Sequence, residues 1–434
     1  MSNWVTKPLG ELITLQRGHD LPSQDRKAGS VPIMGSSGIT GYHDEVKTRG
    51  PGVVIGRSGN SMGEVSFSPV DFWPLNTCLY VTDFKGNDER YIYYLLQTIN
   101  FDQFNSGSAQ KSLNRNAVYP YEVKTTECKD EQVRIARNLA ALEDKIELNR
   151  QTNQTLENIA QVIFKSWFVD FEPTRAKIAA KEAGQDPERA AMAAISGKPI
   201  EELDQLSAEQ QEQLKATAAL FPDALVDSEL GEIPEGWEAK PLSQMVNLIG
   251  GGTPKKSEAT YWGGEIPWFS VKDAPDDGDV FVIDTELKIT ELGLNKSSTK
   301  LLPEGTTIIS ARGTVGRLAL VGVPTAMNQS CYGVQGVDGI GPYLNYFNVK
   351  EAVSTLKQNT HGAVFDTITR ETFDTVILVQ AKGDVLVKFE EVVKSNLNSI
   401  KNNLFESKAL EEARDSLLPK LLSGEIALEP INES

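Results

Sequence analysis

The sequence has few cysteines and no long apolar run. Its three cysteines, Cys78, Cys128 and Cys331, form no CxxC pair. They therefore suit a reducing compartment and argue against a zinc site. No stretch of about 18 apolar residues exists, which excludes a transmembrane helix. The start, Met1–Trp4, lacks a basic region followed by an apolar core, so we expect no signal peptide, no membrane contact and a cytoplasmic protein.

Motifs of several enzyme classes are also missing. The sequence contains no GxxxxGK[ST] loop for nucleotide phosphates and no Asn/Asp-Pro-Pro-Tyr/Phe motif of an adenine methyltransferase. We therefore predict neither a metal site nor a cofactor in this chain. One formal match remains: Pro275-Asp276 followed by Glu286-Leu-Lys288 fits a PD…ExK nuclease pattern. Such matches are common in acidic loops, so a nuclease using Asp276, Glu286 and Lys288 is kept only as an alternative.

Basic side chains are outnumbered by acidic ones, 43 against 60, which gives a formal net charge of −17. Much of the excess of acidic side chains lies in one segment, residues 176–236, which carries 5 basic and 13 acidic side chains. Residues 1–128 carry 12 basic and 13 acidic side chains and are nearly neutral. Net charge speaks to solubility and to steering of ligands, not to the fold. The globular parts can therefore each carry a basic face.

What the sequence does contain is an internal repeat. The segment Trp4–Leu9 (WVTKPL) is matched by Trp237–Leu242 (WEAKPL). The block Gly107–Val123 aligns without gaps with Gly362–Leu378, and Tyr91–Leu96 matches Tyr343–Asn348 between them. Three matches in the same order predict a duplicated chain. Gly-bounded β-rich runs such as Gly52–Gly56 and Gly305–Ser310 predict that each half is mixed α/β with many short strands.

A helical period follows each half. From Asp130 to about Phe168 the apolar positions recur at steps of 4 and 3, with a polar step at Asn149 and Asn153. About 39 residues give a helix of about 58 Å. The second copy runs from Asp384 to about Leu422, where Pro419 should kink or end the last turn. So narrow a seam favours pairing of the two helices, which run antiparallel if a pseudo-two-fold axis relates the halves.

The expected fold is therefore α+β, with two mixed α/β domains joined by two long antiparallel coiled-coil helices. Residues 173–232, acidic and rich in alanine, have no counterpart after the second helix, and we expect them to be partly helical and partly mobile. The expected segments are 1–128 for the first domain, 129–172 for the first long helix, 173–232 for the insert, 233–383 for the second domain, 384–426 for the second long helix and 427–434 for the tail.

Several segments resemble one family. Ile146–Arg150 (IELNR), Leu156–Ala160 (LENIA) and Phe164–Pro173 (FKSWFVDFEP) are similar to the central conserved region of type I restriction-modification specificity subunits. Ser228–Trp237 resembles the entry to the second target recognition domain of those subunits. Further similar segments are Gly50–Gly59, Gly251–Pro254, Tyr261–Trp268 and Leu417–Glu425. The insert at 173–232 departs from the family pattern.

The resemblance implies a DNA-specificity subunit that is not itself an enzyme. Each recognition domain is expected to read one half of a split, asymmetric site in double-stranded DNA, while the helix pair sets the spacing. The implied partners are two modification (methyltransferase) subunits and restriction subunits with translocase and nuclease activity. S-adenosylmethionine, ATP and Mg²⁺ would be used by those partners. A two-domain scaffold that binds protein or glycan is an alternative of another class, which strong, salt-dependent, sequence-specific DNA binding would exclude.

Base and phosphate contacts call for polar and basic side chains on loops. In the first half these candidates are Ser36, Ser37, Arg57, Ser58, Asn60, Ser61, Lys111, Ser112, Asn114 and Arg115. In the second half they are Lys255, Lys256, Ser270, Lys272, Arg312, Thr314, Arg317, Gln329, His361 and Arg370. Any one of them can equally be a turn residue or a solvated charge. Recurrence of Arg57, Arg115, Arg312 and Arg370 in comparable places suggests either shared phosphate contacts or structural pairs.

An aromatic cluster is wider than a two-helix seam needs. It consists of Phe164, Trp167, Phe168 and Phe171. It either covers the end of the helix pair or docks a modification subunit, because large apolar patches often mark partner surfaces. We predict partner binding for these four residues.

Overall fold

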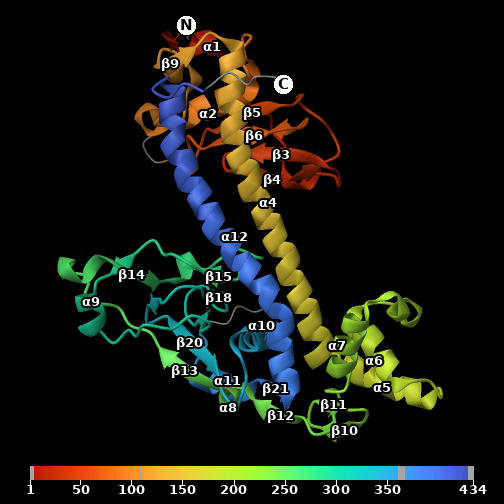
Figure 1. Ribbon diagram of the computed structural model, residues 1–434. Helices are drawn as coiled ribbons and strands as arrows, with labels where there is room; N and C mark the ends of the chain where they lie inside the picture. The colour runs from red at the N-terminus through yellow and green to blue at the C-terminus, as the bar shows by residue number, and fades with distance from the viewer. Residues whose placement is uncertain (1–3, 108–109, 360–366, 429–434) are drawn as a thin grey trace. The chain divides into compact units, whose positions relative to one another are not determined.

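The computed structural model describes residues 4–107, 110–359 and 367–428. They form two compact units, the first of residues 1–146 and 408–434 and the second of residues 147–407. Two long helices, α4 (Lys129–Phe168) and α12 (Asp384–Leu422), contribute to both units (Figure 1). No helix in these described ranges combines the length and apolar character needed to cross a bilayer.

Unit 1 is built on an antiparallel sheet of order β2-β8-β5-β6 and a smaller sheet of order β4-β3-β7. Strand β1 pairs with β9, which ties the start of the globular part to its end. The strands are β1 (Trp4–Pro8), β2 (Thr14–Arg17), β3 (Val31–Gly35), β4 (Gly38–His43), β5 (Gly52–Gly56), β6 (Val65–Ser68), β7 (Trp73–Pro74), β8 (Cys78–Asp83) and β9 (Glu122–Thr126). The short helices are α1 (Leu9–Leu12), α2 (Glu89–Gln97) and α3 (Arg115–Val118), with 3₁₀ turns at Ser23–Asp25 and Phe101–Phe104.

The globular part of unit 2 repeats this plan with sheets of order β13-β20-β17-β18-β15 and β16-β14-β19, and β12 pairs with β21. The strands are β12 (Glu238–Pro241), β13 (Val246–Gly250), β14 (Trp262–Phe269), β15 (Phe281–Val282), β16 (Lys288–Ile289), β17 (Thr307–Ser310), β18 (Leu318–Val321), β19 (Ala326–Met327), β20 (Cys331–Gly336) and β21 (Ile377–Gln380). The helices are α8 (Leu242–Met245), α9 (Glu291–Asn295), α10 (Pro342–Asn359) and α11 (Arg370–Thr375), with 3₁₀ turns at Ala259–Tyr261 and Val271–Asp273.

Strand register confirms the duplication residue by residue. Gly56 of β5 pairs with Cys78 of β8, and Ser310 of β17 pairs with Cys331 of β20. Both cysteines are buried, and burial raises the pKa of each thiol to about 12. They act as small apolar residues at equivalent points of the two sheets. The edge strand β15 is an addition, because the described sheet of unit 1 ends at β6.

The two long helices begin and end within one residue of the periodic segments Asp130–Phe168 and Asp384–Leu422, and they pair. In unit 2 the Asn149 amide donates to Glu406 Oε2 (2.9 Å), and Asn403 donates to Asn153 Oδ1 (2.9 Å). The number on one helix rises as the number on the other falls, so the pair is antiparallel. In unit 1 Leu139 and Leu421 belong to one core. Helix α12 contains Pro419 and continues to Leu422, so the helix does not end at that proline.

The insert is a helical module that ends in a hairpin, so the expected helices are present. It contains α5 (Glu172–Glu182), α6 (Pro187–Ser196), a 3₁₀ turn (Ile200–Gln205), α7 (Ala208–Ala218) and a hairpin of β10 (Leu225–Ser228) and β11 (Gly231–Pro234). Lys177 is 4% exposed, and its ammonium donates to Glu188 (2.8 Å) and to the Phe221 carbonyl (2.9 Å). A buried ammonium with these partners holds α5, α6 and the end of the module together.

The aromatic cluster at the end of α4 is part of the core of unit 2. Phe164, Trp167, Phe168 and Phe171 are only 2–6% exposed. Phe389 of α12 contacts the first three, with ring centroids 5.2–6.2 Å apart, and Trp237 stacks on Phe168 at 5.8 Å. The prediction that these four residues bind a partner is therefore wrong, because the chain's own side chains already cover them.

Replacing Phe389 by alanine is expected to lower the free energy of unfolding of unit 2 by about 3–5 kcal/mol, since a fully buried ring at the centre of the cluster is lost. Urea unfolding followed by tryptophan fluorescence measures the change. Val387→Ala is the matched control on the same helix: its side chain is 57% exposed, and the change should stay within about 0.5 kcal/mol. Equal unfolding midpoints for the two variants would contradict the packing described.

Candidate nucleic-acid interface

Unit 1 carries an open polar groove beside the end of β2. Its volume is about 690 Å³, and four predicted DNA contacts line it: Arg57, Ser112, Asn114 and Arg115. These residues come from two segments that are far apart in sequence. Ser58 and Ser112 form a β-bridge, and the Leu113 N–H donates to the Arg57 carbonyl (2.8 Å). The fold therefore brings the two predicted loops to one surface.

Two further groove residues, Arg17 and His19, were not among the candidates. They flank Gly18, where a Cβ would lie 2.1 Å from the Leu75 carbonyl oxygen, so only glycine fits. Gly251, the equivalent residue of unit 2, is equally confined, 1.9 Å from the Asn328 carbonyl oxygen. This recurring glycine was the signal in the sequence that could have located them.

The groove is basic although the chain is acidic. Arg17, Arg57 and Arg115 face it with one carboxylate, Asp20, among the lining residues. His19 contacts the Tyr80 hydroxyl (3.3 Å), and burial, followed by the nearby Lys47 charge, lowers the pKa of its imidazole. Below that lowered pKa His19 adds a further positive charge. Such a cluster attracts a polyanion.

One pair of arginines is anchored in the same way in both units. Arg115 Nη1 donates to the Leu15 carbonyl (2.9 Å), and Arg370 Nη2 donates to the Leu248 carbonyl (3.4 Å). Leu15 and Leu248 hold equivalent places on β2 and β13. Both arginines are exposed, so the anchored guanidinium still presents donors outward. The recurrence was expected to reflect either shared phosphate contacts or structural ion pairs. The structural partner of each arginine is a backbone carbonyl group and not a carboxylate.

The other proposed pair of arginines is not equivalent. Arg312 bridges to Thr367, as Ser58 bridges to Ser112. The Ile368 N–H donates to the Ala311 carbonyl (2.9 Å), as Leu113 does to Arg57. Arg57 therefore corresponds to Ala311 and Arg312 to Ser58. The arginine of this loop is therefore shifted by one position between the two units. Equivalent positions of the two sheets carry different side chains.

The remaining candidates of unit 1 gather near the same edge. A Cβ at Gly56 would lie 2.0 Å from the Ser61 carbonyl oxygen and 2.6 Å from that of Ser36, so these two loops meet there. The Ser36 hydroxyl donates to the Thr77 carbonyl (2.7 Å), while Lys111 pairs with Asp102 (2.7 Å). Ser37 and Asn60 are exposed.

In unit 2 the candidates fall into two groups. The exposed ones are Lys255, Lys256, Lys272, Arg312, Thr314, Gln329 and Arg370. Ser270 instead donates to Asp273 (2.8 Å), and the half-buried Arg317 donates to the Pro275 carbonyl (2.8 Å). Both side chains hold local structure in this unit. His361 lies outside the described residues.

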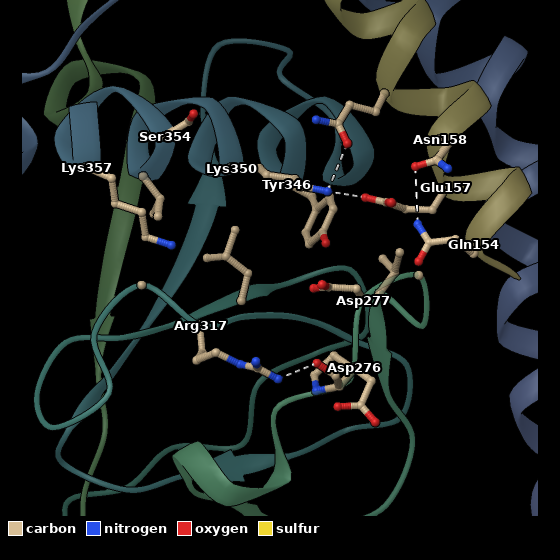
Figure 2. Close-up of a pocket in the computed structure, with 17 residues that line it drawn as sticks. Gln154, Glu157, Asn158, Asp276, Asp277, Arg317, Tyr346, Lys350, Ser354 and Lys357 are labelled. Atoms are coloured by element: carbon tan, nitrogen blue, oxygen red, sulfur yellow. Dashed lines mark hydrogen bonds and ion pairs between the residues drawn. The ribbon is translucent and has the colours of Figure 1, made fainter. Parts of the chain in front are cut away.

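A second cavity, of about 500 Å³, lies in unit 2 between α4, α10 and the loop 275–280 (Figure 2). Glu157 of α4 forms an ion pair with Lys350 of α10, and Lys350 also donates to Gln161 (3.1 Å). The loop side contributes Asp276 and Asp277. Carboxylates line this cavity from both sides, whereas Asp20 is the one carboxylate among the residues that line the groove of unit 1.

The residues of the nuclease alternative do not assemble into a site. Lys288 pairs with Asp284 (3.2 Å), and the Glu286 N–H donates to Asp273 (2.8 Å). Asp276 lines the cavity of Figure 2 instead. Within the described ranges, no group of three or more His, Cys, Asp or Glu side chains is placed to hold a metal ion.

Comparison with known proteins gives consistent matches. The family model described as the type I restriction modification DNA specificity domain matches residues 1–158 and 234–378. The HindI specificity subunit of a type I restriction enzyme from Haemophilus influenzae is 36% identical over 312 residues, which covers 69% of this chain and 68% of that protein. The MjaIX specificity subunit from Methanocaldococcus jannaschii is 28% identical over 194 residues, 43% of this chain and 44% of that protein.

Among solved structures, the S subunit of a type I restriction-modification system from M. genitalium aligns with a TM-score of 0.56. The alignment covers 97% of this chain and 96% of that one at 15% identity, a likeness of fold alone. The family model leaves out residues 159–233, which include most of the helical insert.

Replacing Arg115 by alanine is expected to weaken DNA binding by a similar factor for every sequence, because an anchored arginine shared by both units suits a phosphate contact. The slope of log K against log salt should become shallower by about one. Fluorescence anisotropy at several salt concentrations measures both. The control is Lys7→Ala, which removes a positive charge from β1, where Lys7 pairs with Glu127. A sequence-dependent loss for Arg115→Ala would contradict the phosphate assignment.

Proposed function

We propose, for a chain that belongs to the family of type I restriction-modification DNA specificity subunits, that its two recognition domains each read one half of a bipartite target. The chain is a DNA-recognition subunit and not a catalytic one. The first recognition domain comprises residues 1–128 and the second residues 233–383. Double-stranded DNA is the ligand of both, in the cytoplasm.

The observation that carries this proposal is the combination of a repeated frame with different polar loops. Strand order and register recur, and Arg115 and Arg370 are anchored alike. The loop side chains at Arg57 and Ala311, and at Ser58 and Arg312, differ. Phosphate contacts position a protein on DNA and base contacts specify the sequence. A shared frame with different loops therefore suits two half-sites of different sequence.

The helix pair supplies the second element of the function. Helices α4 and α12 are 40 and 39 residues long and contribute to both units, which supports the proposal that the helix pair sets the gap between the half-sites. Half-site spacing in other DNA-binding proteins likewise follows from a rigid separation of two reading elements. On the exposed faces of this pair, two modification subunits and the restriction subunits are the proposed partners. S-adenosylmethionine, ATP and Mg²⁺ would be used by those subunits.

Exchange of residues 237–383 for the same domain of another family member is expected to change one half of the target only. The spacing should persist, because both long helices are retained. Methylated positions are mapped by single-molecule sequencing in cells that express the hybrid chain with the modification subunit encoded beside it. The reciprocal exchange of residues 1–128 is the control and should change the other half. A change in both halves from either exchange would contradict independent reading.

A further inference from the structure

The loop Pro275–Val280 is a feature of unit 2 that leads into the added edge strand β15. It lies directly on α4: a Cβ at Gly278 would be 2.8 Å from the Cα of Gln154 and 3.0 Å from its nitrogen. Gly278 also has φ of +95°, a conformation that favours glycine. The loop backbone therefore touches the helix backbone, with no room for a side chain between them.

The next two residues, Asp279 and Val280, are held in energetically unfavourable states. Asp279 is partly buried, and burial raises the pKa of its carboxyl group, while a hydrogen bond from Asn153 Nδ2 (3.1 Å) favours the charged form. Val280 has φ of +53° although it is β-branched, and its side chain is 2% exposed. The Leu320 N–H donates to the Val280 carbonyl (2.8 Å). Such backbone strain persists only where the surroundings impose it.

The Asn153 amide connects three elements. Its side chain is 1% exposed, its Nδ2 donates to Asp279, and its Oδ1 accepts from Asn403 Nδ2 of α12 (2.9 Å). One buried amide thus bonds α4 to α12 and to the loop of the second recognition domain. Because a buried amide without partners is costly, this arrangement is strongly selected over neighbouring ones.

The domain is also joined to α12, where Glu390 accepts from the Leu344 N–H (2.7 Å) and Lys401 pairs with Glu304 (2.6 Å). Figure 2 shows the polar cavity of about 500 Å³ between α4, α10 and the loop, with the Glu157–Lys350 ion pair crossing it. Some 11 residues further along α4, about 16 Å away, Phe164 stacks on Phe347 of α10. Apolar packing at that end is not directional, whereas hydrogen bonds are. The directional bond between Asn153 and Asp279 therefore adds a constraint on the angle of the domain that apolar packing does not supply.

We propose that the hydrogen bond between Asn153 and Asp279 fixes the orientation of the second recognition domain on the helix pair, so that these are positioning residues for half-site spacing. This inference rests on the proposed function and deepens it. One extra base pair between the half-sites moves the second by about 3.4 Å and turns it by roughly 35°. A domain held at one angle rejects that change, and a domain free to rotate tolerates it.

The test is made with the full chain, expressed in cells together with its modification subunit. Target plasmids carry the two half-sites with the native gap or with one base pair added or removed, and sequencing measures methylation at each. The native chain is expected to favour the native gap, and Asp279→Ala should lower this preference about tenfold, as loss of a hydrogen bond to a charged group implies. Asn153→Leu removes the bond from the helix side and should act alike.

Two controls make the result specific. Asp279→Asn retains an oxygen that accepts from Asn153 and should keep the preference for the native gap. Asp276→Ala removes the same charge from the same loop at an exposed position and should also keep it. The inference is overturned if Asp279→Ala leaves the preference unchanged, or lowers methylation by one factor at every gap, as a merely structural role would. Absence of any gap preference in the native chain would instead overturn the proposed function.

Discussion

The buried contact between α4 and α12 is the constraint on which the rest of the protein depends. Its polar step consists of Asn149, Asn153 and Asn403, whose amides bond across the helix pair. A polar step in an apolar seam lowers stability but fixes register, because a shifted pair would leave buried amides without partners. In unit 2 the same network extends through Asp279 into the sheet domain. The helix pair is thus a support with a defined register, and not only a connection between domains.

Each of the two domains attached to this helix pair has the same arrangement of strands but different polar loops. Equivalent strands pair in the same order, Cys78 and Cys331 occupy the same buried point, and the arginines at 115 and 370 donate to equivalent carbonyl groups. The polar loops differ, because Arg57 and Ser58 of unit 1 correspond to Ala311 and Arg312 of unit 2. Identical halves would read identical sequences. Divergence of the loops on a common frame is what reading an asymmetric target requires.

Much of this could be predicted from sequence, for physical reasons that also explain the failures. The 4-3 period persists over about 39 residues, so the periodic segments Asp130–Phe168 and Asp384–Leu422 match α4 and α12 within one residue. The Gly107–Val123 block aligned correctly because it contains no gap, as the bridge partners Ser112 and Thr367 confirm. Arg57 was matched with the wrong residue because the glycine-rich loops between the blocks differ in length. Burial of Phe164 and the Asn153–Asp279 bond depend on α10, α12 and β15, which lie more than a hundred residues further on. A local sequence pattern does not predict such contacts.

Two different surfaces, one in each unit, are proposed to read two different half-sites of one target. Single-molecule methylation mapping of DNA from cells that express the native chain and its modification subunit tests this most directly. The expected result is one motif with two unlike parts separated by a gap of constant length, and no such methylation when the chain is deleted. A contiguous motif, two identical half-sites, or a gap that varies from site to site would contradict it.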